Sequence, residues 1–374
     1  MAASETVGDW IALVHDRYPP AHAASWDNVG LQVGDPDWPV ARVLVCLDVT
    51  GDVIDEAATV PGTLVLAHHP LLFRPLATLT PATAAGRTAL HAATARVPVV
   101  AAHTNLDVAR DGAGTSDPVA DVLGLVDRRP LTTELRDGDR VKLVTFVPDA
   151  HVDPVLDALA AAGAGTIGDY ERCAFRVSGQ GTFRPRPGAD PFSGRVGEVA
   201  IEDEVRLEVE VPRRRVGAVV RALSSAHPYE EVAYDLVPLI AGADVGFGVV
   251  GDLPEPTRLE DVAAAIAERL PAPHLRTAGD LDRLITTVAT VGGAGDGLIG
   301  AAIGAGVDLY VTGDLRHHVT LDALEQGLAL IDAGHHATEA AALPAWIERL
   351  REAATGRSLT AAVVASKVRT VPWS

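Results

Sequence analysis

The sequence predicts an α/β protein in which two similar α/β lobes form one domain and are interrupted by an inserted domain. Near both ends of the chain, β-branched runs alternate with amphipathic helical runs, which is typical of layered α/β domains with a mainly parallel sheet. The middle of the chain has the order β-α-β-β-α-β, the ferredoxin-like signature. The chain has 374 residues, and single cores stop growing at roughly 250 to 300 residues, so more than one domain is expected.

The first lobe is predicted within residues 1–130. The alternation of strand-like and helix-like runs places strands at 41–50, 63–69 and 97–104, and helices at 6–18, 52–59, 86–95 and 117–125.

The same alternation returns in the second lobe, predicted within residues 241–374 and clearest from about residue 285. Strands are expected at 284–293, 307–314 and 328–336, and helices at 297–306, 320–327 and 337–354. The repetition indicates either two halves of one domain or two similar lobes.

The inserted domain is predicted within residues 131–240 and is expected to have its own core. Its strands are predicted at 140–148, 173–183, 204–212 and 231–239, and its helices at 152–163 and 214–226. The stretch 181–198 is rich in Gly and Pro and is predicted to be a long loop.

The composition argues against a membrane protein, an exported protein and a nucleic-acid-binding protein. The hydrophobic share of 48% and the charged share of 22% fit a globular protein in solution, and no apolar run has the roughly 18 residues of a membrane helix. No export signal is visible, so a cytoplasmic location is expected. The net charge of −19 opposes binding to nucleic acid. The two cysteines have no partner at metal-ligand spacing.

Polar side chains follow four of the predicted strands, where each strand ends. In open α/β sheets, ligand sites form outside the carboxyl ends of the strands. Imidazole and carboxylate without thiolate are the ligands of Zn, Mn, Fe or a similar divalent ion in catalytic sites. The sequence therefore predicts a metal site built from these strand ends, which carry His68 and His69; His103 and Asp107; Asp314, His317 and His318; and His335, His336 and Glu339.

Each motif alone has a plainer interpretation. A histidine at a strand end is often only hydrogen-bonded, and Asp107 could satisfy backbone donors in a turn. In "GHHATE" both His335 and His336 share a helix face with Glu339, so the spacing does not choose between them and also suits an ordinary helix start. "HPYEEVAYD", with His227, Glu230 and Glu231, is expected to be a hydrogen-bonded loop or an interface.

Seven stretches that span nearly the whole chain carry a family resemblance: "SWDNVGLQVG", "LAHHPLLF", "HTNLDVA", "GAGTIGDYERCAFRVSGQGTFRP", "HPYEEVAYD", "VTGDLRHH" and "IDAGHHATE". Together, they resemble the GTP cyclohydrolase I type 2 homologues, or NIF-three-like proteins. The insert looks like the PII/CutA-type domain of the longer bacterial members.

The resemblance implies a two-metal centre in a cleft between the lobes. It assigns His68 and His335 to one metal, His69 and Asp107 to the other, and Glu339 as the bridge between them. Two positions depart from the family pattern: His336 stands where an aromatic residue is common, and Ser116 where asparagine is common. The resemblance also implies a homo-oligomer, often a homohexamer.

The function expected from these observations is that of a dinuclear metal-dependent hydrolase that uses a metal-bridging water. Its cofactors would be two divalent ions per chain, drawn from Zn, Mn, Fe, Co and Ni, and His103 and His318 are candidates for proton transfer or for orienting substrate. The family name implies opening of the GTP purine ring, and hydrolysis of a phosphoester or another small molecule fits equally well. The alternative is a metal-binding regulatory or interaction protein with the insert as sensor or gate. A third interpretation keeps the fold and places no metal at these residues.

Overall fold

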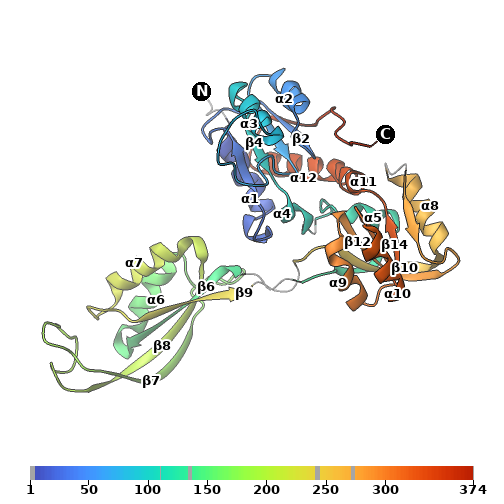
Figure 1. The fold of residues 1–374 in the computed structure, drawn as a ribbon. Coiled ribbons are helices and arrows are strands. Elements are labelled where there is room, and N and C mark those ends of the chain that lie inside the picture. The colour runs from blue at the N-terminus through green and yellow to red at the C-terminus, as the bar shows by residue number, and fades with distance from the viewer. Residues whose placement is uncertain (1–4, 110, 134–136, 241–244, 271–273, 374) are drawn as a thin grey trace. The chain divides into compact units, whose positions relative to one another are not determined.

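The computed structural model describes residues 5–109, 111–133, 137–240, 245–270 and 274–373. The chain forms two compact units, one of Met1–Glu134 with Ala243–Ser374 and one of Leu135–Gly242. Two sheets belong to the first unit and one sheet to the second (Figure 1). The α/β class predicted from the sequence is confirmed. None of the helices in the described ranges is long and apolar enough to cross a bilayer.

The first sheet of the first unit is largely parallel. Its strand order is β1-β4-β3-β2-β15, and only the β1–β4 pair is antiparallel. The three predicted strands form its centre, and two four-residue strands that the sequence patterns missed form its edges. The strands are β1 (Gly30–Val33), β2 (Arg42–Cys46), β3 (Thr63–Ala67), β4 (Val99–Ala101) and β15 (Ala362–Ala365).

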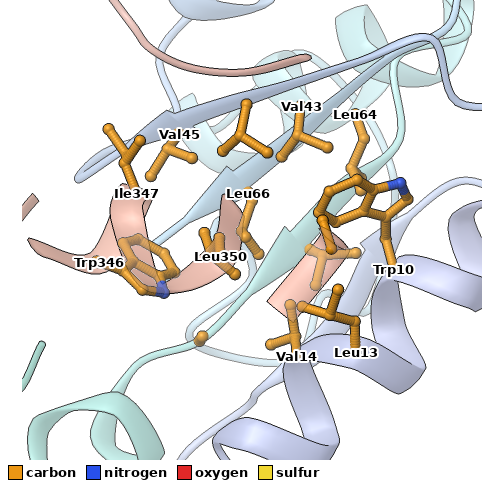
Figure 2. Packing of buried hydrophobic residues seen from close by; sticks show 14 of the residues in the cluster. Trp10, Leu13, Val14, Val43, Val45, Leu64, Leu66, Trp346, Ile347 and Leu350 are labelled. Carbon is orange, nitrogen blue, oxygen red and sulfur yellow. The ribbon is translucent and has the colours of Figure 1, made fainter. Parts of the chain in front are cut away.

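Helices cover both faces of this sheet. On one face, α1 (Val7–Arg17) and α12 (Leu343–Gly356) bury Trp10 and Trp346 against Val43, Val45 and Leu66 (Figure 2). On the other face, α2 (Gly51–Ala58) and α3 (Ala84–Thr94) pack against β2, β3 and β4. Burial of these apolar side chains from both faces is the main force that holds the strands in place.

The last segment of the chain returns to the first sheet. Helix α12 packs on β2 and β3, and β15 adds to the free edge of β2 in parallel, from Ala362↔Arg42 to Ala365↔Val45. The predicted second lobe, 241–374, includes this segment, although α12 and β15 pack on the first sheet.

The second sheet of the first unit is mixed. Its strand order is β11-β14-β13-β12-β10-β5; β12, β13 and β14 are parallel, and the other pairs are antiparallel. The three central parallel strands were predicted, and the outer ones were not. The strands are β5 (Val126–Pro130), β10 (Val249–Arg258), β11 (Arg276–Ala278), β12 (Leu284–Ala294), β13 (Leu309–Gly313) and β14 (Ala329–Asp332).

Two helices of the first unit correct a prediction. A single helix was predicted at 337–354, but the structure has α11 (His335–Ala340) followed by α12, with Pro344 in the first turn of α12. Proline favours the first turn of a helix and disrupts a helix interior, which explains the break. The other helices of this unit are α4 (Thr104–Asp107), α5 (Asp117–Val122), α8 (Leu259–Arg269), α9 (Ile299–Gly304) and α10 (His317–Glu325).

The second unit has its elements in the order β-α-β-β-α-β. Its sheet has the strand order β7-β8-β6-β9, with all neighbours antiparallel. Both helices contribute to one buried core with the sheet, and residues 184–199 contain no helix or strand, as predicted for a loop. The elements are β6 (Asp137–Pro148), α6 (Val152–Ala161), β7 (Phe175–Phe183), β8 (Ala200–Pro212), α7 (Val216–Ala226) and β9 (Tyr234–Ile240).

Candidate metal centre

Three histidine side chains, which follow strands of two different sheets, surround one buried carboxylate, that of Glu339. Nε2 of His69 lies 3.1 Å from Oε2 of Glu339, and Nε2 of His335 lies 3.2 Å from Oε1. Nε2 of His68 lies 3.6 Å from the same Oε1. His68 and His69 follow β3 of the first sheet, whereas His335 and Glu339 lie on α11, which follows β14 of the second.

Consecutive histidines reach different sides of this centre because each is held by a different neighbouring strand. Nδ1 of His68 lies 3.0 Å from the carbonyl oxygen of Ala102, at the end of β4. Nδ1 of His69 lies 2.9 Å from Oδ1 of Asp48, at the end of β2. Because β3 lies between β4 and β2, the two rings diverge.

The ring nitrogen that faces the centre, Nε2, is the one that would bind a metal once the ring is neutral. A carbonyl or carboxylate oxygen only accepts hydrogen bonds, so Nδ1 carries the hydrogen in both His68 and His69. Nδ1 of His335 is held in the same way, 2.7 Å from Oδ2 of Asp314. With Nδ1 protonated, the neutral imidazole presents the lone pair of Nε2, as in most histidine metal ligands.

Helix α11 is brought to the centre by close backbone approaches. A Cβ on Gly293, which has φ +69°, would overlap Oε1 of Glu339, and a Cβ on Gly313 would overlap the backbone of His335. The buried hydroxyl of Thr338 accepts from the Gly293 N–H at 3.0 Å and donates to the carbonyl of His335 at 2.8 Å. Glycine at the ends of β12 and β13 therefore lets the ligand-bearing turn of α11 approach the sheet.

Asp107 is the second carboxylate near His68, in addition to Glu339. Its Oδ1 lies 3.4 Å from Nε2 of His68 and accepts a 2.6 Å hydrogen bond from the hydroxyl of Thr115. Asp107 ends α4, so the turn "HTNLD" carries its carboxylate to the centre.

These distances group the residues differently from the pairing that the resemblance implies. Nε2 of His335 lies 3.4 Å from Nε2 of His69, and His68 is the histidine that approaches Asp107. The distances thus place His68 near both Asp107 and Glu339, and His69 and His335 near Glu339. The reason is the anchoring of His68 toward β4, from which α4 follows, and of His69 toward β2.

His103 also belongs to this region. Its Nδ1 lies 2.9 Å from Oδ1 of Asp27, and its ring centroid is 5.1 Å from that of His68 and 5.6 Å from that of His69. His68, His69 and His103 form a second group whose ligand atoms lie within 4.8 Å of one another.

His318 is not brought to the centre. The chain leaves β13 through Asp314, which has φ +57° and lies beside His335. His318 then lies on α10, is exposed, stacks edge-to-face on His317 and is not among the residues that line the cavity at the centre. The predicted role of His318 in proton transfer or substrate orientation therefore loses its basis.

The two departures from the family pattern both lie at the cavity. His336 lines it beside His335, and burial lowers the pKa of His336. Ser116 is buried, and its hydroxyl accepts the N–H of Gly292 at 3.2 Å. The serine therefore ties the segment after α4 to β12.

The close contacts at the centre shift the pKa values of Glu339, His69 and His335. Burial opposes the charge of Glu339, but contacts with His335, His68 and His69 outweigh it and hold the pKa of Glu339 well below its usual range. Burial also disfavours protonated His69, yet Asp48 and Glu339 raise its pKa to about 10. Contact with Glu339 raises the pKa of His335 to about 9 despite burial.

The residues fit a divalent ion. Nε2 of His68 and Oε2 of Glu339 are buried and make no hydrogen bond of acceptable geometry within the described part of the chain, although buried polar atoms are normally satisfied. The His69, His335 and Glu339 group and the His68, His69 and His103 group each place ligand atoms close enough for one ion, and neither contains a cysteine. Nitrogen and carboxylate donors without thiolate suit a catalytic rather than a structural Cys-based site.

The centre opens into a cavity of about 1660 Å³ with an aromatic rim. Trp26 and Phe73 are 61% and 47% exposed and meet edge-to-face with ring centroids 5.7 Å apart. Both rings also approach His103, at 6.2 and 6.3 Å. Arg276 and Arg369 add positive charge to the lining.

The sequence reasoning missed the carboxylates that hold the histidine rings. Asp48 follows the apolar run of β2, and Asp27 lies in the quoted motif "SWDNVG". Asp48 could have been found as an acidic residue near the end of the strand predicted at 41–50, but such residues are common at turns without any ligand role. Asp27 lies near no predicted strand, so the motif was its only signal.

Comparison with known proteins gives a consistent assignment. The sequence model of the Duf34/NIF3 (NGG1p interacting factor 3) family matches residues 5–372. The chain is 40% identical over 372 residues, 98% of each chain, to a Halalkalibacterium halodurans protein named GTP cyclohydrolase 1 type 2 homolog. It is 41% identical over 338 residues, 90% of each chain, to a Bacillus subtilis protein of the same name.

Solved structures agree with this assignment. A Bacillus cereus protein related to NIF3 is 36% identical, with 98% of each chain covered and a TM-score of 0.75. A Staphylococcus aureus protein is 29% identical, with 100% of this chain and 99% of that chain covered and a TM-score of 0.82.

Metal binding is expected to release protons at about pH 8. In the metal-free protein, His69 and His335 have pKa values raised to about 10 and about 9, so both rings are protonated there, and a metal binds only the neutral ring. The apparent affinity should therefore fall as the pH falls below these values. Calorimetric titration with Zn²⁺ in two buffers of different ionisation enthalpy measures the release. Unperturbed histidines, with pKa about 6.5, would release almost none, and that result would contradict the electrostatics described above.

Gly293→Ala is expected to weaken metal binding. The added methyl group would meet the carboxylate of Glu339 at a residue with positive φ, so α11 or its ligand would have to shift. Gly300→Ala in α9 is the matched control, because a Cβ there meets open space. Equilibrium titration with Co²⁺ compares the two. Equal affinities in both variants would rule out the close approach of β12 to Glu339.

Proposed function

The chain belongs to the Duf34/NIF3 family, as its motifs predict, and we propose that it is a divalent-metal-dependent hydrolase that holds two ions per chain. One ion would be held by His68, Asp107 and Glu339, and the other by His69, His335 and Glu339. The observation that carries the proposal is the cluster of imidazoles around the buried Glu339 carboxylate. Within the described residues, Nε2 of His68 and Oε2 of Glu339 are both buried there without a hydrogen bond of acceptable geometry. The identity of the metal stays open among Zn, Mn, Fe, Co and Ni, because this donor set suits several ions.

The proposed chemistry is hydrolysis. When bound, a pair of divalent ions would supply an activated water near neutral pH and stabilise developing negative charge. The chain's own residues orient this chemistry: Asp48, Asp314 and the carbonyl of Ala102 fix the three imidazole rings through Nδ1.

His103 is the proposed proton-transfer residue. Its Nδ1 is held by Asp27, so its Nε2 is the nitrogen free to give or take a proton. It lines the cavity next to the rings of His68 and His69. A general acid or base needs this placement within reach of the bound substrate.

The substrate proposed first is GTP or a related purine nucleotide. Two relatives carry the name GTP cyclohydrolase 1 type 2 homolog. The exposed rings of Trp26 and Phe73 offer faces on which a planar base can stack, and Arg276 and Arg369 line the same cavity. A phosphoester without a base is the competing substrate class.

The architecture proposed with this function has three parts. They are a first lobe at 1–130, a ferredoxin-like insert of the PII/CutA type at 131–240, and a second lobe at 241–374. Two segments cross between the lobes: α12 and β15 return to the first sheet, and β5 joins the second. The strand order of the second unit supports the ferredoxin-like assignment, because its first strand lies between the third and the fourth. We also propose a cytoplasmic homohexamer, which the molecular mass in solution tests.

A regulatory or interaction protein is the second candidate. The observation that favours it is a separate cavity of about 710 Å³ in the second unit, lined in part by Tyr229, Glu230 and Glu231 of the "HPYEE" motif. In that case the insert would act as sensor or gate, and the metals would be structural or stored.

Glu339→Gln is expected to abolish turnover while the oligomer survives. The substitution removes the negative charge shared by both proposed ion sites and keeps the side-chain size. GTP and a panel of phosphoesters are assayed after reconstitution with each of the candidate metals. Glu348→Gln is the control, because Glu348 lies exposed on α12 beside Arg351. Wild-type protein that turns over no substrate with any metal, while partner binding depends on the insert, would favour the regulatory candidate.

A further inference from the structure

The segment after β15 lies beside the candidate metal centre. Strands β2 and β15 are parallel and end at the same edge of the first sheet. From that edge β2 continues to Asp48, and β15 continues to residues 366–373. Topology therefore brings the C-terminal segment next to the carboxylate that holds His69. The segment contributes one wall of the cavity, through Arg369, Thr370, Val371, Pro372 and Trp373.

The start of this segment is anchored to the first sheet. The Ser366 N–H donates to the carbonyl of Val45 at 2.8 Å, and the Ser366 hydroxyl donates to Oε2 of Glu56 at 2.5 Å. The Lys367 N–H donates to Oε1 of Glu56 at 3.1 Å. Val368 packs against the buried cluster under α2. The position of Thr370 is thus set by the sheet edge.

Asp48 uses its two oxygens for two different partners. Oδ2 accepts a 2.6 Å hydrogen bond from the hydroxyl of Thr370, and Oδ1 lies 2.9 Å from Nδ1 of His69. Rotation of this carboxylate away from one partner breaks its bond to the other. Nε2 of the same His69 lies 3.1 Å from Glu339, so the direction of the ligand nitrogen depends on the plane of Asp48.

His69 depends on this support more than His68 does. Nδ1 of His68 is held by a main-chain carbonyl, which the β-sheet fixes directly. The carboxylate of Asp48 stands on a rotatable side chain that is 39% exposed, so water competes for its oxygens. A second hydrogen bond from the protein keeps such a carboxylate in one orientation.

We propose that Thr370 is a positioning residue of the metal centre, acting through Asp48 to aim the imidazole of His69. The C-terminal segment is then part of the metal-binding machinery and more than a cover over the first sheet. The inference rests on the metal-binding part of the proposed function and is independent of the reaction.

The test is Co²⁺ binding by the full chain, followed by visible absorption. Thr370→Val removes the hydroxyl at nearly constant size and is expected to weaken binding about 10- to 100-fold, the usual effect of losing a group that orients a metal ligand. Thr370→Ser keeps the hydroxyl and should restore both the affinity and the absorption bands. Thr94→Val is the control, because that hydroxyl donates to the carbonyl of Leu90 on α3, away from the cavity.

A double-mutant cycle separates positioning from a general effect on folding. If Thr370 acts through Asp48, the effect of Thr370→Val disappears in an Asp48→Ala background. Unchanged Co²⁺ affinity and absorption in Thr370→Val would overturn the inference, as would an equal loss in both backgrounds. Wild-type protein that binds no Co²⁺ would overturn the proposed function as well, whereas a normal wild type with an unaffected variant overturns the positioning role alone.

Discussion

The structure depends on the burial of one carboxylate, that of Glu339, which is 4% exposed and lies within 3.6 Å of three histidine nitrogens. A charge taken out of water is costly unless positive partners surround it. Those partners come from the ends of strands in two different sheets, so the first unit assembles its centre only when both sheets are in place. Gly293 and Gly313 reflect the same constraint, because side chains there would keep the carboxylate from its partners.

The histidine rings are held in position for metal binding by hydrogen bonds at Nδ1. His68, His69, His103 and His335 each have a hydrogen-bond acceptor at Nδ1, and four different segments supply these acceptors. Such support fixes the ring and its tautomer and makes Nε2 a better donor to a metal. The aromatic rim of Trp26 and Phe73 lies beside His103, so a substrate ring held there would be next to the proposed ions.

The sequence predicted the central strands and most of the residues of the centre, because strand ends of a parallel sheet meet at one edge.

Prediction from the sequence failed where the sequence pattern was short or ambiguous. Strand β15 has four residues, and its return to the first sheet is a tertiary event that no local pattern contains. His318 follows a strand as His69 does, but the turn at Asp314 directs it away from the cavity. Helical spacing could not choose between His335 and His336, and the family motif was needed for that choice. The grouping of ligands depends on which neighbouring strand anchors each ring, which the linear sequence does not contain.

The central claim is that this chain holds divalent ions at the Glu339 cluster. Elemental analysis of protein purified without added metal or chelator, combined with thermal unfolding followed by tryptophan fluorescence, tests it directly. All five tryptophans lie outside residues 135–242, so the fluorescence reports on the unit that carries the centre. We expect close to two equivalents of Zn, Mn, Fe, Co or Ni per chain, and a lower unfolding temperature after the metal is removed. Protein that retains none of these metals, and whose unfolding temperature does not change when they are added, would contradict the account.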